Sequence, residues 1–585
     1  MVIAKKLENK KLIILFNSLI FTIGFNLVII FQRYMNYKAA GNNAIYAAMF
    51  EFIYALAFVY PFLYSLSFKN NFVRLITYFI YIASGLGAYF VYNYNININS
   101  EIIASFFEAN RVEVQTLLSL NIILAVFASI LLAWLFLWLA NNSIMNRDQD
   151  KKLTFVTAVF TIACLFGDSD WGGNIFPYNI LKETGNYFLE KTSVVKKRLN
   201  IAESYTYEVD AAATEDLNIV LIIGESARND HFSLGGYHKN TNPSLSKEGD
   251  NLVFYKNVTA CYPLTRSAVP CMITRATRDN RKIAAQETSF IGVFKKLGFY
   301  TAWLGMQGTY TAIDAPYYDL AKESHKALLL GTDVDVFSSN DSSLFPLVDE
   351  FYKEHNTGKT FLVLHTYGSH FHYEERYTDE FRIFQPVCTK KKFLTDMNHC
   401  ALEERINSYD NSIVFTDYFI TRIIDKLRNK KTLVIYTPDH GESLGEGGRF
   451  LHGTHNADEQ IAVPMLFWAS DKYIKSFPKN FKNLKSGKFL HYITDDKEKS
   501  ALVAADFALI WDSDINSVSK HGCVPIAKAN GDETVDYNPL LEKGNGFYYK
   551  DINKWEIFAA IVRACETYQF PYDWENLIKG ILGSK

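Results

Sequence analysis

Five long apolar blocks in the first 168 residues limit the fold more than any other feature of the sequence. They run roughly over Leu12 to Phe31, Ile45 to Phe68, Val73 to Tyr92, Leu117 to Ala140 and Leu153 to Gly167. An α-helix needs about 20 apolar residues to cross the hydrocarbon core, and every block except the shorter fifth one has about that length. A cleaved signal peptide would explain only the first block. The sequence therefore predicts a transmembrane domain of five helices over residues 1–168.

Basic residues around the apolar blocks predict their orientation. They precede the first block, separate the second from the third and precede the fifth: Lys5, Lys6, Lys10, Lys11, Lys69, Arg74, Arg147, Lys151 and Lys152. By the positive-inside rule these segments are cytoplasmic. An odd number of crossings then places the loop from Asn93 to about Val114, and everything after residue 168, outside. The formal net charge of −2 gives no indication of a nucleic-acid partner.

After residue 168 the apolar residues come as short runs between polar loops. We expect a linker with a helix over 169–204 and a soluble domain over 205–585. Runs of strand length are LNIVLIIG (217–224), YTAWLG (300–305), TFLVLHT (360–366), TLVIYT (432–437) and VPMLFW (463–468). Helical patterns lie between them, such as FIGVFKKLG and the segment from Glu403 to Asn429. This alternation predicts a three-layer α/β/α domain around a largely parallel sheet.

Six of the seven cysteines lie in the part predicted to be outside, where the compartment favours disulfides. The seventh, Cys164, lies in the fifth apolar block and is expected to be a buried apolar residue. Six cysteines allow 15 pairings. Proximity in the sequence favours Cys261 with Cys271, Cys388 with Cys400, and Cys523 with Cys565. Buried free thiols are the alternative.

Residues that can bind a metal follow three of the predicted strands. Glu225 follows the first run, and the others follow the third and fourth runs: His365, His370, His372, Asp439, His440, His452 and His455. Each one alone is more often a core, surface or capping residue. Because ligands of such folds gather at the carboxyl ends of the strands, the joint placement predicts one cluster. Carboxylates and imidazoles are suitable ligands for Zn²⁺.

A nucleophile is expected in the loop bracketed by the first cysteine pair. The segment CYPLTRSAVPC contains two hydroxyl side chains, Thr265 and Ser267. A metal lowers the pKa of a coordinated hydroxyl and neutralises charge on a phosphoryl group, so either residue could attack phosphorus. The spacing alone does not distinguish them.

Five motifs in this order resemble the phosphoethanolamine transferases of Gram-negative inner membranes, a group that includes lipid A modifying and mobile colistin-resistance enzymes. The motifs are GESARNDHFSLGGYHKNTNPSL, NVTACYPLTRSAVPCM, LHTYGSH, INSYDNSIVFTDYFI and DHGESLGEGGRFLHG. The resemblance extends, with gaps, to about residue 468. It implies five membrane helices and a periplasmic domain of the alkaline phosphatase and sulfatase type. It also implies transfer of phosphoethanolamine from phosphatidylethanolamine, through a covalent phospho-Thr, to a lipid A phosphate or sugar.

The resemblance assigns roles to individual residues. The family's nucleophile matches Thr265. The zinc ligands that join it match Glu225, Asp439 and His440. Two further histidines, His370 and His452, would bind the phosphoryl oxygens or a second zinc, and one of them would protonate the leaving alkoxide. In this mechanism Thr265 expels diacylglycerol, and an acceptor oxygen then attacks phospho-Thr265.

The sequence departs from the family in three places. Where the family has Asn, Thr and Glu for the lipid head group, this chain has Ser105, Ala109 and Glu113, so only Glu113 is retained for substrate binding. A family Lys and a cysteine pair have no counterpart in GMQGTYTAIDAPYYD. The tail from about residue 470 is atypical and finishes with the helical pattern KWEIFAAIVRACETYQF, expected to cover the domain or bind the acceptor. Three histidines match no family role: His365, His372 and His455.

Three other functions are compatible with parts of the sequence. A sulfatase would convert Cys261 to formylglycine and lose the disulfide, although Arg266 lies one place late for the Cys-x-Pro-x-Arg pattern. A phosphoglycerol transferase would share the topology and the Thr nucleophile but use phosphatidylglycerol. A catalytically silent receptor would be expected to have lost ligands that this chain retains.

The acceptor stays open between a lipid A phosphate, core heptose and another envelope component, and so does the number of zinc ions. We expect a monomer. If lipid A is the acceptor, the added amine would reduce negative surface charge and weaken the binding of cationic peptides such as polymyxins.

Overall fold

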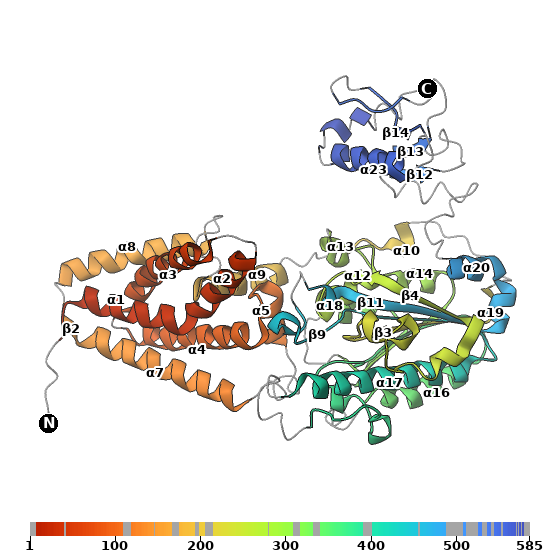
Figure 1. Ribbon diagram of the computed structural model, residues 1–585, viewed down its shortest axis with the longest axis horizontal. Helices are drawn as coiled ribbons and strands as arrows, with labels where there is room; N and C mark the ends of the chain where they lie inside the picture. The colour runs from red at the N-terminus through yellow and green to blue at the C-terminus, as the bar shows by residue number, and fades with distance from the viewer. Residues whose placement is uncertain are drawn as a thin grey trace. The chain divides into compact units, whose positions relative to one another are not determined.

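The computed structural model divides the chain into two compact units, Met1–Phe481 and Lys482–Lys585. The described residues are 7–39, 43–68, 70–108, 119–144, 147–166, 175–192, 198–204, 214–278, 280–307, 316–330, 340–389, 400–453, 457–486, 507–510, 524–528, 535–539, 543–550, 554–568, 570, 572–574 and 576–577. The first unit contains the N-terminal apolar helices and an α/β domain with a seven-stranded sheet (Figure 1). The second unit has a three-stranded sheet of its own.

The N-terminal apolar blocks form long helices. They are α1 (Lys10–Phe21), α2 (Leu27–Ala39), α3 (Ala44–Leu66), α4 (Asn71–Tyr94), α7 (Leu120–Asn142) and α8 (Arg147–Phe166), with a π-helical turn η1 (Thr22–Asn26) joining α1 to α2. Four stretches are long and apolar enough to cross a membrane: Lys10–Met35, Ala44–Leu66, Asn71–Tyr94 and Leu120–Asn142. These four correspond to the first four predicted membrane helices.

The fifth predicted membrane helix, α8, is not among the four candidate spans found in the described residues. Its first turns are charged, which leaves a short apolar segment after Lys152. Helix α8 nevertheless belongs to the bundle, because it packs along α3. At its start, Asp150 accepts a hydrogen bond of 2.7 Å from Nζ of Lys10 at the start of α1.

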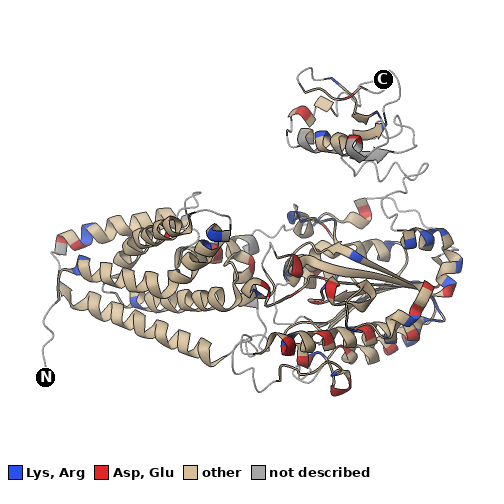
Figure 2. Ribbon diagram, in the orientation of Figure 1, with Lys and Arg blue, Asp and Glu red and all other residues tan. Residues whose placement is uncertain are grey.

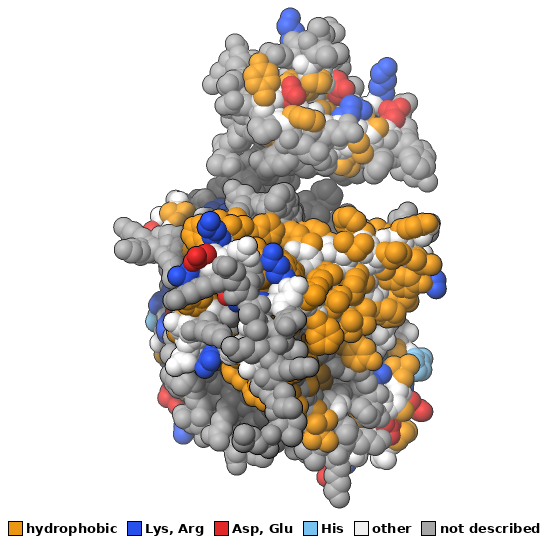
Figure 3. Space-filling model, turned by 90° about the vertical axis from the view of Figure 1, so that its left-hand side faces the viewer, with side chains coloured by type: hydrophobic (Ala, Val, Ile, Leu, Met, Phe, Trp, Pro, Cys, Tyr) orange, Lys and Arg blue, Asp and Glu red, His pale blue; other side chains and the backbone are white. Residues whose placement is uncertain are grey.

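Aromatic side chains fill the interior of the helix bundle. Tyr81 packs edge-on against Phe21 at 5.0 Å and stacks on Phe136 at 6.0 Å, and all three are buried. The outer faces are also apolar, with exposed residues such as Phe79 and Leu124. Figure 2 shows few charged residues along these helices, and Figure 3 shows a broad apolar surface. A helix that is apolar on all sides is typical of a membrane span.

Two shorter helices accompany the long ones: α5 (Ser100–Glu108) lies between α4 and α7 in the chain, and α9 (Tyr178–Thr192) follows α8. They contact each other, and Phe107 of α5 stacks on Tyr187 of α9 with ring centroids 5.5 Å apart. The segment from Asn93 to Val114 was expected to be an external loop, and the structure shows that part of it is the helix α5.

The sheet of the α/β domain has the strand order β4-β11-β8-β3-β7-β5-β6. Its strands are β3 (Leu217–Gly224), β4 (Leu252–Thr259), β5 (Tyr300–Gly305), β6 (Lys326–Leu329), β7 (Thr360–His365), β8 (Lys431–Pro438) and β11 (Ala462–Ala469). Strand β11 pairs antiparallel with both β4 and β8, and the other pairs of neighbouring strands in this sheet are parallel. All five predicted strands are present, and the largely parallel sheet is confirmed. The sequence prediction missed β4 and β6, which form the two edges.

Helices cover both faces of this sheet, in the three-layer arrangement that the sequence predicts (Figure 1). On one side lie α16 (Phe345–Glu354) and α17 (Leu402–Leu427), and on the other α12 (Thr265–Ile273) and α14 (Phe290–Lys296). Smaller elements complete the domain: α10 (Ile201–Ser204), α13 (Lys282–Gln286), α15 (Pro316–Ala321), β9 (Ser443–Leu444), β10 (Phe450–Leu451), α18 (Asp458–Ile461), α19 (Asp471–Ser476) and α20 (Pro478–Ser486).

The C-terminal unit contains three parallel strands and one long helix. They are β12 (Phe507–Ile510), β13 (Val524–Lys528), β14 (Phe547–Tyr549) and α23 (Lys554–Tyr568). Ala560 and Ala564 of α23 pack on Ile526 and Phe547 in a separate small core. The helix predicted at the end of the chain is therefore confirmed. Cys523 and the side chain of Cys565 lie outside the described residues.

Candidate active site

Two neighbouring parallel strands bring three potential metal ligands together. Glu225 follows β3 directly, and Asp439 and His440 follow β8, which pairs with β3 in register. Nε2 of His440 lies 3.3 Å from Oε1 of Glu225 and 3.5 Å from Oδ2 of Asp439. All three side chains are buried. The carboxyl ends of adjacent parallel strands thus create the cluster that the sequence predicts.

Thr265 lies at the same place, in the first turn of α12. Its hydroxyl donates to Oε2 of Glu225 at 3.0 Å and lies 3.3 Å from Nε2 of His440. A disulfide between Cys261 and Cys271 closes the segment that contains it. Ser267, the other candidate nucleophile, points elsewhere and donates to Oε1 of Glu101 at 3.1 Å.

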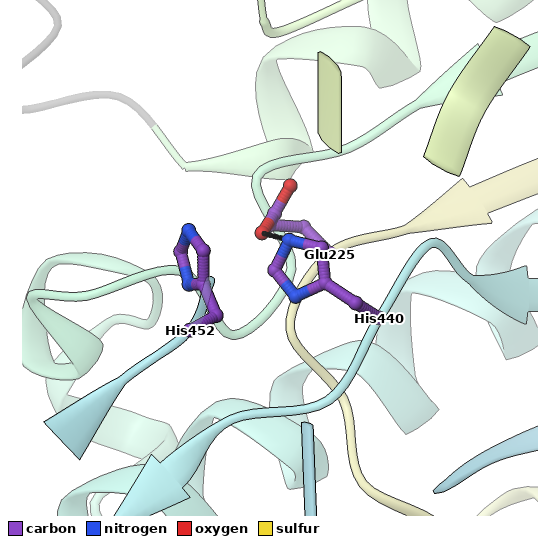
Figure 4. Close-up of side chains that lie close together, drawn as sticks. All are labelled: Glu225, His440 and His452. Atoms are coloured by element: carbon purple, nitrogen blue, oxygen red, sulfur yellow. Dashed lines mark ion pairs between the residues drawn. The ribbon is translucent and has the colours of Figure 1, made fainter. Parts of the chain in front are cut away.

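His452 and His370 extend the cluster on one side. The imidazole rings of His440 and His452 are 4.2 Å apart between centroids, and those of His370 and His452 are 5.9 Å apart. One ligand atom each from Glu225, His440 and His452 lies within 4.8 Å of the other two, and Figure 4 shows these side chains converging. The structure therefore groups all six residues expected in the catalytic and metal-binding site: Glu225, Thr265, His370, Asp439, His440 and His452.

Hydrogen bonds fix the tautomers of the three histidines. Nδ1 of His440 donates to the carbonyl of Gly441 at 2.8 Å, and Nδ1 of His370 donates to the carbonyl of Phe371 at 2.6 Å. Nδ1 of His452 lies 2.8 Å from Oε2 of Glu442. A histidine whose Nδ1–H is engaged in this way presents the lone pair of Nε2, as a metal ligand does.

The buried charges of the site influence one another. Burial raises the pKa of Glu225, but the nearby His440, His370 and His452 more than offset this effect and hold its pKa below the usual value. Burial and the negative charge of Glu225 raise the pKa of Asp439 well above its usual range. Burial lowers the pKa of His370, although Glu225 opposes that shift. The ionised Glu225 therefore disfavours the ionised form of Asp439.

This arrangement fits a bound cation. Oδ2 of Asp439 is buried and has no hydrogen-bond partner in the described part of the chain. Nδ1 of His440 bonds the carbonyl of Gly441, and Nε2 on the other side of the ring faces this oxygen and Oε1 of Glu225. A positive ion would satisfy all three groups, and this mixed nitrogen and oxygen ligand set is one that zinc accepts.

A second layer of residues holds Glu225 in place. Gln307 donates to its Oε2 at 2.7 Å, and the hydroxyl of Ser226 donates to its Oε1 at 2.6 Å. Ser226 has a left-handed backbone with φ of 56°. Tyr409 of α17 fixes that turn, because its hydroxyl donates to the carbonyl of Ser226 at 2.6 Å and accepts from the amide of Arg228 at 2.8 Å.

The sequence prediction missed Gln307, Tyr409 and Glu442. Gln307 follows β5 at the same edge of the sheet, so the strand-end argument could have found it. Glu442 and Tyr409 lie inside motifs that carry the family resemblance, but no local pattern indicates what they contact.

The remaining predicted residues lie apart from the cluster or outside the described chain. His365 is fully buried, packs edge-on to Trp303 and Tyr317, and its pKa is lowered to about 4 by burial. Ser105 is exposed and donates to the carbonyl of Glu101. Three residues lie outside the described chain: Ala109, Glu113 and His455.

The structure contains two disulfides among the described residues, Cys261–Cys271 and Cys388–Cys400. The latter joins the segment before α17 to Cys388, whose amide donates to the hydroxyl of Ser408 at 2.9 Å. Cys164 is a buried free thiol, as expected. A cysteine held in a disulfide cannot be the formylglycine precursor of a sulfatase, so Cys261 in this state disfavours that alternative.

Two family models match the chain. The model described as Sulfatase matches residues 217–491, and the model described as Phosphoethanolamine transferase EptA/EptB matches residues 55–167. The first covers the α/β domain and the second covers most of the apolar helices.

Relatives found by sequence similarity are also named as phosphoethanolamine transferases. Kdo(2)-lipid A phosphoethanolamine 7''-transferase of Escherichia coli strain K12 is 34% identical over 315 residues, covering 51% of this chain and 53% of the relative. Phosphoethanolamine transferase EptA of the same strain is 28% identical over 446 residues, covering 71% and 80%. The chain thus aligns with about half of the first relative and most of the second.

A solved structure supports the fold. The integral membrane lipooligosaccharide phosphoethanolamine transferase A of Neisseria meningitidis superposes with a TM-score of 0.68 at 21% identity, covering 82% of this chain and 92% of that one. The membrane helices and the α/β domain therefore share one known architecture. By its two family matches and its relatives, the chain is similar to phosphoethanolamine transferases over the α/β domain and most of the apolar helices.

Proposed function

We propose that this protein transfers phosphoethanolamine from phosphatidylethanolamine to lipid A or another envelope acceptor, through a covalent intermediate on Thr265. The observation that carries the proposal is the position of the Thr265 hydroxyl, within hydrogen-bond distance of Glu225 and His440 in a buried cluster. The names of the relatives supply the transferred group, and one of them also names lipid A.

We propose zinc as the metal, with Glu225, Asp439, His440 and Thr265 as its ligands. When bound, it would supply positive charge that favours the alkoxide form of Thr265 and offsets the charge of the phosphoryl group. His370 and His452 lie beside these residues and would bind phosphoryl oxygens or a second zinc.

In the first step Oγ1 of Thr265 attacks the phosphorus of the donor. The bond between phosphorus and the glycerol oxygen breaks. The proton that leaves the Thr265 hydroxyl passes through His370 or His452 to the glycerol oxygen, and diacylglycerol leaves. Glu225 orients the hydroxyl by accepting its hydrogen bond. Because Thr265 begins a helix of nine residues, the amide groups of the first turn of α12 also favour the negative charge of phospho-Thr265.

In the second step an acceptor oxygen attacks phospho-Thr265. The bond between Oγ1 and phosphorus breaks, and the Thr265 hydroxyl is restored. A lipid A phosphate and a core heptose are both compatible with this chemistry.

We further propose an inner-membrane protein with its α/β domain in the periplasm and α8 as a fifth membrane helix. The disulfides and the basic segments between the apolar blocks support this orientation. The proposal includes a monomer, a domain boundary near residue 168, a linker over 169–204, head-group binding by Glu113, and pairing of Cys523 with Cys565.

The test is intact mass spectrometry of the full-length protein before and after incubation with phosphatidylethanolamine in vesicles, followed by peptide mapping of residues 257–272. We expect a phosphoethanolamine adduct on Thr265 and none in Thr265→Ala, whereas Ser267→Ala should still form it. An adduct from phosphatidylglycerol instead would favour a phosphoglycerol transferase. An adduct on another residue, or none with either lipid, would contradict the proposal.

A further inference from the structure

Helix α5 contacts the segment that carries Thr265 through one carboxylate. Oε1 of Glu101 accepts a hydrogen bond of 3.1 Å from the hydroxyl of Ser267, in the first turn of α12. The same oxygen accepts from the guanidinium of Arg281, which lies beyond the other end of α12. Glu101 is only 7% exposed, so this carboxylate is held between the two segments and out of solvent.

A second residue of α5 packs where two active-site segments meet. Gly453 follows His452 and has a left-handed φ of 102°, and a Cβ placed on it would lie 2.9 Å from Cδ1 of Ile102. The same position is 3.5 Å from a methyl of Leu264, the residue before Thr265. Helix α5 therefore contacts both the Thr265 segment and the His452 segment.

The start of α5 is fixed relative to the membrane helices. Helix α4 ends at Asn95, which has a left-handed φ of 53°. Gln32 of α2 donates to the side chain of Asn95, and the side chain of Asn99 accepts from the amide of Ile102 at 2.9 Å. Only Ile96 to Asn99 separate this turn from α5, so the location of Glu101 follows that of α4.

We infer that Glu101 is a positioning residue, which holds the nucleophile segment at the end of the membrane helices so that Thr265 can reach a donor lipid in the bilayer. This inference rests on the proposed function. Glu101 bonds Ser267 and Arg281, whereas the Thr265 hydroxyl bonds Glu225 and lies beside His440, so the loss of Glu101 should leave the reacting groups in place. Without Glu101, the Thr265 segment is no longer held in line with the donor, whose phosphorus lies at a depth set by the bilayer. Small misalignments of reacting groups reduce reaction rates strongly.

The test compares two donors in Glu101→Ala and Glu101→Gln. We expect adduct formation on Thr265 to slow by about 10- to 100-fold with phosphatidylethanolamine in vesicles, and by less than about threefold with a short-chain, water-soluble phosphatidylethanolamine. Glu287→Gln is the matched control, because Glu287 is equally buried at 7% and is paired with Arg275, two residues after the end of α12. The rate of adduct formation in Glu287→Gln should stay within about threefold of the wild-type rate with both donors.

Two further measurements separate positioning from general structural damage. Charge exchange in Glu101→Arg with Arg281→Glu should recover part of the rate with vesicles. Hydrogen exchange should show faster uptake in residues 264–273 of Glu101→Ala, and wild-type uptake in Glu287→Gln. If the wild type forms no adduct, the proposed function is overturned. The hydrogen-exchange experiment needs no turnover, so it would still test whether Glu101 holds residues 264–273.

Three outcomes would overturn this inference. An equal loss of rate with both donors would make Glu101 part of the reacting site or of the fold. An unchanged rate with vesicles would show that the contact does not align the donor. Unchanged exchange in residues 264–273 would show that Glu101 does not hold the segment.

Discussion

Two buried clusters of carboxylates and histidines lie in the same α/β domain, and they differ in how their charges are satisfied. In one, Asp410 of α17 accepts from Nδ1 of His231 at 2.6 Å, from Nζ of Lys239 at 2.6 Å and from the hydroxyl of Tyr237 at 3.0 Å. Each oxygen of Asp410 thus has at least one donor. The protein itself neutralises this carboxylate, as a buried ion pair requires.

The cluster at the strand ends lacks this compensation. Glu225 and Asp439 are both buried, their charges oppose each other, and Oδ2 of Asp439 has no donor within the described residues. Burying a charge without a partner costs several kcal/mol. Residue types alone would not distinguish the two clusters. The difference in hydrogen-bond satisfaction indicates that the first serves the fold and the second needs a cation.

The largest expected difference concerns bound metal. Asp439→Asn removes one of the facing negative groups, so the metal content of the purified protein, measured by inductively coupled plasma mass spectrometry, should fall to background together with adduct formation on Thr265. Asp410→Asn should keep the metal content of the wild type. Equal metal loss in both variants would contradict the distinction between the two clusters.

The next effect concerns stability. Asp410→Ala leaves His231, Lys239 and Tyr237 without their acceptor, so the free energy of unfolding should fall by about 3–5 kcal/mol. Denaturant unfolding followed by tryptophan fluorescence would measure this change. A matched exposed pair provides the control, because Asp319→Ala removes only the surface contact with Lys322 and should change stability by less than about 0.5 kcal/mol. A neutral result for Asp410→Ala would mean that the first cluster does not serve the fold.

A smaller effect is expected at Glu442, which contacts both a buried tyrosine of the fold and a histidine of the metal cluster. This carboxylate accepts from the hydroxyl of Tyr373 at 3.0 Å and lies 2.8 Å from Nδ1 of His452. Glu442→Gln should weaken the orientation of His452 and reduce the rate of adduct formation about 10- to 100-fold. Tyr373→Phe keeps the contact with His452 and should cost less. If both variants lose activity equally, Glu442 acts through the fold and not through His452.

The smallest effect is the pH dependence of a third buried carboxylate, Asp417. It accepts from the amides of Ser244 and Leu245 at 2.9 Å, and burial raises its pKa from 3.8 to about 6. A raised pKa means that its contribution to stability is fully present below about pH 4 and is lost as the pH rises through about 6. Asp417→Asn cannot ionise, so relative to wild type it should gain about 1–2 kcal/mol between pH 4.5 and 7.5.

Thermal unfolding of wild type and Asp417→Asn at both pH values would measure this gain. Because other carboxyl groups titrate equally in both proteins, their effect cancels in the difference. A difference that does not change with pH would show that the Asp417 carboxyl is not responsible.

Apolar runs and the residues after them were enough to locate five of the seven strands of the large sheet and the edge where the ligands meet. Unbroken apolar runs locate β3 and β8 because both are buried on two faces, and Glu225, Asp439 and His440 follow them directly. The edge strands β4 and β6 were missed because the second half of β4 is mostly polar and exposed, and β6 has only four residues.

The choice between the two hydroxyl groups required the folded structure. Thr265 and Ser267 are two residues apart on α12, and two residues correspond to about 200° of rotation around a helix. Thr265 therefore faces Glu225, and Ser267 faces Glu101 of α5. The contacts of Glu101, Gln307, Tyr409 and Asp410 join segments that are far apart in the chain. Local sequence patterns report periodicity and burial, whereas such pairings depend on how the elements pack.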